Sequence, residues 1–232
     1  MRSSVWTRER RRPPRETLSR EQVVRAAIEL LDSEGLNGLS MRKLAERLSA
    51  GATSIYWHVE TKDDLLEYVI DEIYGEVDVP DADLAGWRSG AILLAHSLRA
   101  TILRHPWLPE AISSRISIGP NAMSLSRRAT ALFRSAGFTG FDLDHAAGAL
   151  FSYVIGSTGS QAAWMATVKA SGKTVNEWAN EVYAQALAAA KDDYPEQKER
   201  IADWKDVDLL QMQSASFSFG LECLLDGFAA RL

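Results

Sequence analysis

The segment LSMRKLAERLSAGATSIYWHVETK, residues 39–62, decides the fold of this chain. Its apolar residues recur at helical spacing in two short runs, which are separated by a tight Ser-Ala-Gly connection at 49–51. The first run predicts a helix after Ser40, and the second predicts a helix over 52–58. The residues expected on the buried sides are Leu44, Leu48, Ile55 and Val59. A helix, a tight turn and a short second helix fit the major groove of DNA.

The outward face of the helix over 52–58 distinguishes this head from other small helical domains. Small side chains at its start allow close approach to base edges, and aromatic O–H and N–H groups can hold phosphates. Arg42 is the forked donor that can bind guanine bidentately, and Lys62 is placed for a phosphate. The predicted DNA-binding residues are Ser40, Met41, Arg42, Ala52, Thr53, Ser54, Tyr56, Trp57, His58 and Lys62. Two alternatives stay open: Trp57 could pack on the head, and His58 could cap a helix without touching DNA.

The chain before this segment is basic and begins without helical signals. Residues 1–62 hold 12 Lys and Arg against 8 Asp and Glu, whereas residues 63–232 hold 14 against 23. This asymmetry indicates that a polyanion is met at the N-terminal end. Two adjacent prolines predict a flexible arm over residues 1–17, and a Ser-Arg-Glu-Gln capping box at 19–22 then opens a helix that Gly35 closes. The arm residues predicted to contact the minor groove are Arg8, Arg10, Arg11 and Arg12; a solubilising tail is the alternative.

Helical periodicity continues through the rest of the chain and predicts an all-α protein. Thr61 is expected to cap a connecting helix that runs to about Val77, and Pro80 stops it. The predicted division is an arm over 1–17, a three-helix helix-turn-helix head over 18–62, a connecting helix over 63–80 and a larger ligand-binding and dimerisation body over 81–232. The helices expected in the body span about 84–104, 107–115, 120–136, 142–170, 174–192, 195–203 and 208–230.

Composition excludes several classes of protein. Apolar residues make up 46% of the 232 residues and charged residues 25%, which is typical of a globular domain with a sizeable core. The longest apolar runs are far shorter than the roughly 20 residues of a membrane helix, and the basic N-terminus lacks the apolar region of a secretory signal. The single Cys223 excludes an intramolecular disulfide and a cysteine-based metal cluster. These features predict a cytoplasmic protein with no metal, no cofactor and no membrane partner.

The head resembles the DNA-binding domain of the TetR family of bacterial transcriptional regulators. The motifs that carry the resemblance are Ala26–Leu31, Glu34–Leu36, Leu39–Ala45 and Ser54–Val59, together with Lys62, Leu65 and Leu66. The body more loosely resembles that of the tetracycline-repressor subgroup, through Arg104–Trp107, Gly119–Asn121 and Phe217–Gly227.

The resemblance implies roles for several head residues. It implies that the position of Arg42 reads a base, and that those of Tyr56 and Lys62 serve phosphates. Two departures matter. Ser49 replaces the glycine usual in the turn and must take a conformation that glycine adopts more easily. Ala52 and Thr53 offer no amide to read adenine, so the base preference of relatives does not transfer.

Two apolar stripes on the long helices of the body suggest a homodimer. A single head contacts too little DNA for tight specific binding, so proteins of this kind dimerise on palindromes. The resemblance implies a four-helix interface between two copies. The predicted dimerisation residues are Leu150, Val154, Ser157, Phe217, Leu221, Leu224 and Phe228. The alternative is that both stripes face the core of the single chain.

The body also carries the side chains of a small-molecule site, because such sites combine apolar walls with a few polar groups. The predicted ligand-binding residues are His96, Trp107, Asn121, Met123, Tyr153, Gln161 and Trp164. Neither 71–80 nor 111–118 contains a histidine where the tetracycline-binding members hold a metal–drug complex. An apolar or aromatic organic effector is therefore expected instead of magnesium–tetracycline.

These observations predict a ligand-responsive repressor that a small organic molecule releases from a palindromic operator. The alternative with the same fold is an activator or a ligand-independent DNA-binding protein. An enzyme would have to use His96, His105 or His145 with carboxylates such as Glu110 and Asp144. No metal-binding histidine pair, nucleophile elbow or phosphate loop accompanies them, so we expect no enzymatic activity.

Overall fold

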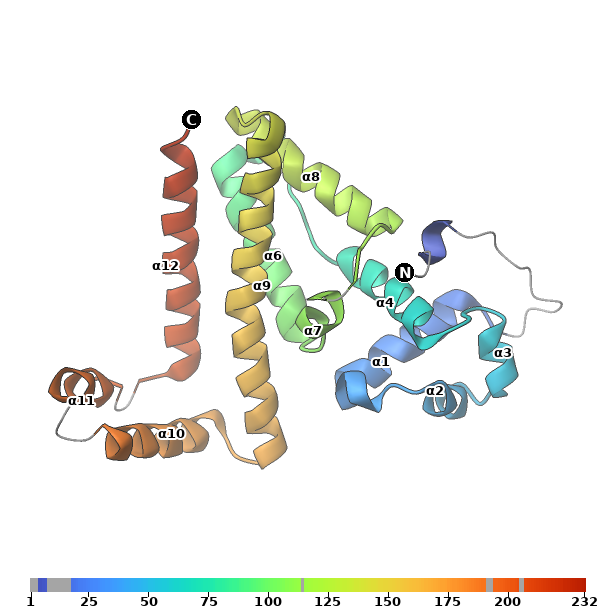
Figure 1. Ribbon diagram of the computed structural model, residues 1–232, viewed down its shortest axis with the longest axis horizontal. Coiled ribbons are helices and arrows are strands. Elements are labelled where there is room, and N and C mark those ends of the chain that lie inside the picture. Colours follow the sequence, from blue (N-terminus) through green and yellow to red (C-terminus); the bar gives the residue numbers. More distant parts are fainter. Residues whose placement is uncertain (1–3, 8–17, 114, 191–193, 205–206) are drawn as a thin grey trace.

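In the computed structural model, residues 4–7, 18–113, 115–190, 194–204 and 207–232 are described, and all their regular elements are helices (Figure 1). The predicted all-α fold is confirmed. The elements in chain order are η1 (Val5–Thr7), α1 (Arg20–Gly38), α2 (Met41–Arg47), α3 (Ala52–Tyr56), α4 (Lys62–Tyr74), α5 (Ala82–Ala85), α6 (Trp87–Arg104), α7 (Leu108–Ser113), α8 (Pro120–Ala136), α9 (Gly140–Ser171), α10 (Val175–Ala189), α11 (Pro195–Ala202) and α12 (Leu209–Ala229). None of these helices combines the length and hydropathy of a membrane span.

The head consists of α1, α2 and α3 around one apolar core, and α4 packs against α1. Ser19 opens α1 with the predicted capping box: its hydroxyl accepts the Gln22 N–H at 3.2 Å, and Gln22 Oε1 accepts the Ser19 N–H at 2.7 Å. Gly35 has φ +68° and kinks α1. The regular helix is interrupted at Gly35 as predicted, and a short helical piece follows it as far as Gly38. The buried centre of the head includes Ala27, Leu31, Leu44, Ile55, Val59 and Leu65.

The turn between α2 and α3 holds Ser49 in the left-handed conformation that its sequence position predicts. Its φ is +49°, the one positive φ of a non-glycine residue in the described chain. A side chain in this region crowds the backbone carbonyl, at a cost of about 1–2 kcal/mol. The packing of α2 and α3 therefore holds this turn in shape against a local preference.

Replacing Ser49 tests this strain. We expect Ser49→Gly to raise the free energy of unfolding by about 0.5–1 kcal/mol, because the relief of strain exceeds the added entropy of the unfolded chain. Ser49→Val should lower it by about 1–2 kcal/mol, since β-branched residues avoid positive φ. Urea unfolding followed by circular dichroism measures both. Equal stability of the two variants would mean that the turn carries no strain.

The body is organised around the long helix α9. Helices α6 and α8 pack against it, and α12 runs alongside it (Figure 1). The predicted helix over 84–104 is divided into α5 and α6, because Gly86 has φ +69°. Helices α10 and α11 lie at the foot of α9 and α12, and neither contains a buried side chain (Figure 1). The largest fully buried side chains of the body include Leu94, Ile102, Leu132, Phe133, Leu150 and Leu221.

Helix α4 joins the head to the body, and one carboxylate on it caps a helix of the body. Asp71 is buried, and its oxygens accept the backbone N–H groups of Asn121 at 3.3 Å and Ala122 at 2.9 Å in the first turn of α8. A carboxylate is stabilising there, because the first N–H groups of a helix have no partner within the helix. Gly119 makes room for it, since a Cβ at this position would overlap the Asp71 carboxylate.

A second set of contacts ties α1 to the end of α6. His105 is buried; its Nδ1 lies 2.7 Å from Asp32 Oδ1, and its Nε2 lies 3.3 Å from Glu76 Oε2. The indole N–H of Trp107 donates to the same Asp32 oxygen at 2.7 Å. Because each imidazole nitrogen faces a carboxylate, whichever nitrogen carries the proton donates to an acid. Glu76 follows α4, which ends at Tyr74 and not at the predicted Val77.

Part of the predicted arm is folded onto α4. At the start of η1, the hydroxyl of the preceding Ser4 and the Val5 N–H both donate to the Glu67 carboxylate, the latter at 3.1 Å. The Trp6 ring meets Tyr68 edge to face, with the ring centroids 5.1 Å apart. The prediction of a flexible arm over 1–17 is therefore wrong for residues 4–7, because buried Val5 and the Trp6 ring supply apolar contacts. The predicted arm contacts Arg8, Arg10, Arg11 and Arg12 lie outside the described residues.

Candidate functional site

The predicted DNA-reading face is exposed on α3, which begins at Ala52, and on the turn that follows. Its exposed side chains are Thr53, Ser54, Tyr56 (49% exposed) and Trp57 (47% exposed). Ile55 and Val59 are buried on the opposite side and fix the orientation of this face. Because Trp57 presents nearly half of its surface to solvent, it is not a core aromatic of the head. α3 ends at Tyr56, so His58 lies beyond the helix and is half-buried.

Arg42 projects from α2 beside this face. Its side chain is 83% exposed, and its nearest acid is Glu46 one turn along the helix, with 3.7 Å between Nη1 and Oε1. Such an exposed pair is weak and opens at little cost. Arg47 on the same helix is held more firmly, because it donates to Glu29 Oε2 at 2.8 Å and 3.2 Å. Arg42 is therefore the arginine of α2 that is free to reach a base.

Three residues predicted to contact DNA make structural contacts within the head, and their DNA contacts stay a prediction. The Ser40 hydroxyl caps α2 by accepting the Lys43 N–H at 3.2 Å. Met41 is half-buried and packs against the core of the head. Lys62 is half-buried, and its ammonium donates to the Leu36 carbonyl at 3.0 Å. The sequence missed this last contact because it joins residues 26 positions apart.

Three predicted ligand-binding residues come together between α6, α9 and α12. The rings of His96 and Tyr153 lie 5.4 Å and 5.6 Å from that of Phe217, measured between centroids. The Tyr153 hydroxyl donates to the Phe217 carbonyl at 2.7 Å. Arg99, which the sequence analysis overlooked, donates to Gln161 Oε1 at 2.8 Å, and its guanidinium lies 5.0 Å from the Phe217 ring centroid. Its place three residues after His96, on the same face of α6, was the signal that could have found it.

Burial shifts the ionisation of this cluster. Removal from solvent lowers the pKa of the Arg99 guanidinium from its usual value. Burial also raises the pKa of the Tyr153 phenol, so that the hydroxyl keeps its proton and remains a donor. The cluster thus combines one cation with aromatic and amide groups.

The other predicted ligand residues are dispersed. Trp107 belongs to the contact with Asp32 between head and body, and the backbone N–H of Asn121 is bound by Asp71. Met123 is exposed on α8. Trp164 stacks on Trp178 of α10 with 5.6 Å between ring centroids. The described contacts of these four residues do not include His96, Tyr153 or Gln161.

Comparison with known proteins decides the family. Residues 23–69 match the family model of bacterial regulatory proteins, tetR family, and residues 79–232 match that of the tetracyclin repressor-like C-terminal domain. An HTH-type transcriptional regulator from Saccharopolyspora erythraea is 37% identical over 98% of this chain and 92% of its own length. The chain belongs to the TetR family.

Two further relatives show how closely this TetR-family regulator follows known members. The HTH-type transcriptional repressor DrrR1 of Streptomyces coeruleorubidus is 34% identical over 96% of this chain and 82% of its own. The crystal structure of the TetR family protein ActR of Streptomyces coelicolor, in complex with actinorhodin, superposes with a TM-score of 0.77 at 27% identity, covering 93% of this chain and 97% of ActR. The chain is thus a DNA-binding transcriptional regulator and not an enzyme.

The predicted dimerisation stripes of this TetR-family regulator face its own core. Most of their residues are buried within the single chain, namely Leu150, Val154, Phe217, Leu221 and Phe228. Leu224 is half-buried against the same core, and the Ser157 hydroxyl donates to the Tyr153 carbonyl at 2.7 Å. Apolar periodicity selects the most hydrophobic face of a helix, and here that face packs α9 and α12 within the protomer. The five buried residues belong to the core of the protomer, whereas the dimerisation role of Leu224 and Ser157 stays a prediction.

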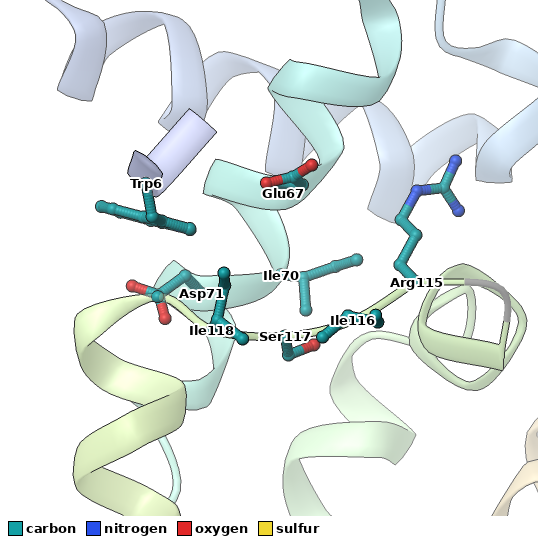
Figure 2. A pocket seen from close by; sticks show the side chains of 9 residues that line it. Trp6, Glu67, Ile70, Asp71, Arg115, Ile116, Ser117 and Ile118 are labelled. Atoms are coloured by element: carbon teal, nitrogen blue, oxygen red, sulfur yellow. The ribbon is translucent and has the colours of Figure 1, made fainter. Parts of the chain in front are cut away.

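Two hollows lie elsewhere on the TetR-family fold. A small pocket of about 10 Å³ lies between α4 and the segment 115–119, with Trp6 and Asp71 on its wall (Figure 2). A larger, open hollow of about 530 Å³ lies between α5 and α8. The arginines that line it are Arg127, Arg128 and Arg134. None of the predicted ligand residues borders either hollow.

Proposed function

We propose that this TetR-family regulator is a cytoplasmic, homodimeric repressor that binds a palindromic operator and is released from it by a small organic effector. The observation that carries the proposal is the exposed polar face of α3 beside the free Arg42, on a head whose opposite side is a packed core. Residues 18–62 would read the operator, residues 63–80 would transmit the signal and residues 81–232 would bind the effector and the partner copy. A repressor name among its relatives and a ligand-bound structural neighbour support this assignment.

On the operator, α3 of each protomer would lie in the major groove. Thr53 and Ser54 are short enough to approach base edges, and the Tyr56 hydroxyl and Trp57 indole reach the flanking phosphates. Two such helices on one palindrome must lie about 34–36 Å apart, which is one turn of DNA, or slightly farther apart. The arginines of the arm would add minor-groove contacts.

The dimer would form through the outer faces of α9 and α12, opposite the faces that pack in the protomer. These outer faces carry small or exposed residues, namely Gly148, Ser152, Gly156 and Ser160 on α9 and Phe219 and Cys223 on α12. Small residues let a partner helix approach closely, and Phe219 is a large apolar side chain of α12 that is 71% exposed. A phenylalanine exposed to this degree is the kind of anchor that interfaces bury.

Effector binding in the body would weaken operator binding by changing the spacing of the heads. Only a ligand that prefers one arrangement of the heads can shift the equilibrium between two arrangements. Besides the covalent link through α4, two sets of hydrogen bonds would carry the shift. They are those of Asp71 with the start of α8 and those of Asp32 with His105 and Trp107. Coupling of about 1–3 kcal/mol would lower operator affinity about 5–150-fold, and operator DNA would weaken effector binding by the same factor.

Arg42→Ala tests the DNA-reading part of the proposal. If Arg42 reads a guanine, its loss should lower operator affinity by about 5–150-fold and relax the preference at one operator position. The operator is first selected from a random DNA pool, and affinity is measured by fluorescence anisotropy on single-position variants. Arg47→Ala is the matched control on the same helix, and we expect it to change affinity by less than about threefold, because Arg47 is engaged by Glu29. A uniform loss over all operator variants with Arg42→Ala would exclude base reading.

A further inference from the structure

The N-terminal turn η1 is held on α4, and each of its three backbone N–H groups has an acceptor. Val5 donates to the Glu67 carboxylate at 3.1 Å. Trp6 and Thr7 donate to the hydroxyl and the carbonyl of Ser4, at 3.3 Å and 3.1 Å. Both described hydrogen-bond donors to Glu67 belong to this N-terminal segment, and Val5 is 8% exposed. Since chain termini are ordered only where the fold ties them down, these contacts make η1 part of the fold.

The Trp6 ring of η1 lies between the head and a segment of the body. On the head side it meets Tyr68 of α4 edge to face, with 5.1 Å between the ring centroids. The Arg20 guanidinium of α1 lies 4.7 Å from the centroid of the same Tyr68 ring. On the body side, Trp6 borders the small pocket together with Ile118 of the segment 115–119 (Figure 2). This pocket measures about 10 Å³, which is room for one water at most, so the ring and the segment lie close together.

The same pocket lies where Asp71 caps α8. The Asp71 carboxylate is on its wall, and it accepts the N–H groups of Asn121 and Ala122 in the first turn of α8. A segment that contacts both sides of a joint stabilises the arrangement in which both sides are within its reach. Ordering terminal residues also costs conformational entropy, so η1 docks only while both contact surfaces are in place. The docking of η1 and the arrangement of α4 and α8 are therefore coupled.

We propose that Trp6 and Glu67 are positioning residues for operator binding. By docking η1 at the joint they hold α4 against the start of α8, and so they fix the orientation of the head on the body. This inference rests on the proposed function, in which the spacing of the two heads decides operator affinity. A joint that is fixed before binding saves the cost of ordering it on the DNA. Neither residue touches the operator, and their effect passes through the Asp71 cap.

Hydrogen exchange at the joint tests the docking of η1. The full-length chain is compared with Trp6→Ala and Glu67→Ala by mass spectrometry of its peptides. We expect the amides of Asn121 and Ala122 to exchange about threefold faster or more in both variants, because a joint without η1 opens more often. Peptides of α9 should keep their wild-type rates, which separates opening of the joint from global destabilisation.

Two further variants serve as controls. Trp6→Phe keeps an aromatic ring that can meet Tyr68 edge to face, so it should restore most of the wild-type protection. Glu72→Ala removes an acid from the same helix as Glu67. Glu72 is exposed, and no described hydrogen bond or ion pair involves its carboxylate. This variant should therefore exchange as the wild type does.

Operator affinity tests the positioning role. On the operator selected from a random pool, we expect Trp6→Ala and Glu67→Ala to lower affinity about 2–30-fold, the range for residues that carry coupling between sites. The slope of log affinity against log salt concentration should keep its wild-type value, because the same phosphates are contacted. Trp6→Phe and Glu72→Ala should bind the operator as the wild type does.

Three results would overturn the inference. They are unchanged exchange at the joint in Trp6→Ala and Glu67→Ala, operator affinity that is unchanged or raised, and a smaller salt slope. The last would assign the loss to the basic residues that follow Thr7. Faster exchange with full operator affinity leaves the repressor function standing and restricts Trp6 to a structural role. If the wild-type chain selects no DNA sequence, the proposed function itself fails, and the positioning role fails with it.

Discussion

A single charge at position 219 should convert the protein into a monomer and abolish tight operator binding. Phe219 is 71% exposed on the outer face of α12, where the proposed interface lies. Phe219→Glu would bury an unpaired carboxylate in that interface, and the cost of doing so exceeds what a few apolar contacts contribute. Once the second head is no longer tethered to the first, the gain from linking two binding modules is lost. We expect operator affinity to fall about 10²–10⁴-fold.

The control is Leu84→Glu, which places the same charge on another exposed apolar residue, outside the faces of α9 and α12 that are proposed to form the interface. Leu84 lies on α5 and is 88% exposed. Light scattering should return a dimer for this variant and a monomer for Phe219→Glu, and circular dichroism should show both folded. A dimer that persists in Phe219→Glu with full operator affinity would move the interface away from α12.

Replacing Gly119 by alanine should have the largest effect on stability. The new Cβ would overlap the Asp71 carboxylate, which is buried and cannot withdraw into solvent. Either the carboxylate moves and α8 loses its cap, or α8 shifts away from α4. We expect the free energy of unfolding to fall by about 2–4 kcal/mol, the combined cost of overpacking and of a lost cap. Urea unfolding at several protein concentrations measures it.

Gly51→Ala is a close control for this substitution. Gly51 and Gly119 share a φ of −70°, which alanine adopts without strain, but the space around Gly51 is open. Gly51→Ala should therefore be neutral or stabilising by about 0.4–1 kcal/mol. In the double variant Gly119→Ala with Asp71→Ala the clash is gone, so the two losses should not add. If the stability losses of the two substitutions add fully, the loss in Gly119→Ala does not come from a clash with Asp71.

Local patterns of sequence predicted the head well. The spacing of Leu44, Ile55 and Val59 correctly predicted the buried core of the head. Ser49, at a position where glycine is usual, correctly predicted a turn with a left-handed residue. The capping box at Ser19 is present as predicted. Each of these features is set by residues within a few positions of one another, so periodicity and capping chemistry are sufficient to find them.

Local sequence patterns could not predict the contacts between segments that are distant in the chain. The Lys62 ammonium was expected to bind a phosphate. Its hydrogen bond to the Leu36 carbonyl could not be predicted, because that bond depends on how α4 crosses α1. The arm was expected to be free because the acceptor of Val5, Glu67, is 62 residues away. The apolar stripes of α9 and α12 could be predicted, but which neighbour covers them could not, since a core face and an interface have the same composition.

The Asp71 cap has a consequence for building chimeric regulators. Heads and bodies of such proteins look exchangeable, because one short helix is the covalent bridge between them. Here, however, the helix carries the Asp71 carboxylate, which fits against the body only because Gly119 has no side chain. Asp32 with Trp107 forms a second such pair. A graft that replaces one residue of either pair removes a contact between head and body while leaving each module folded. A transplanted head must therefore keep the residues that match those of the recipient body.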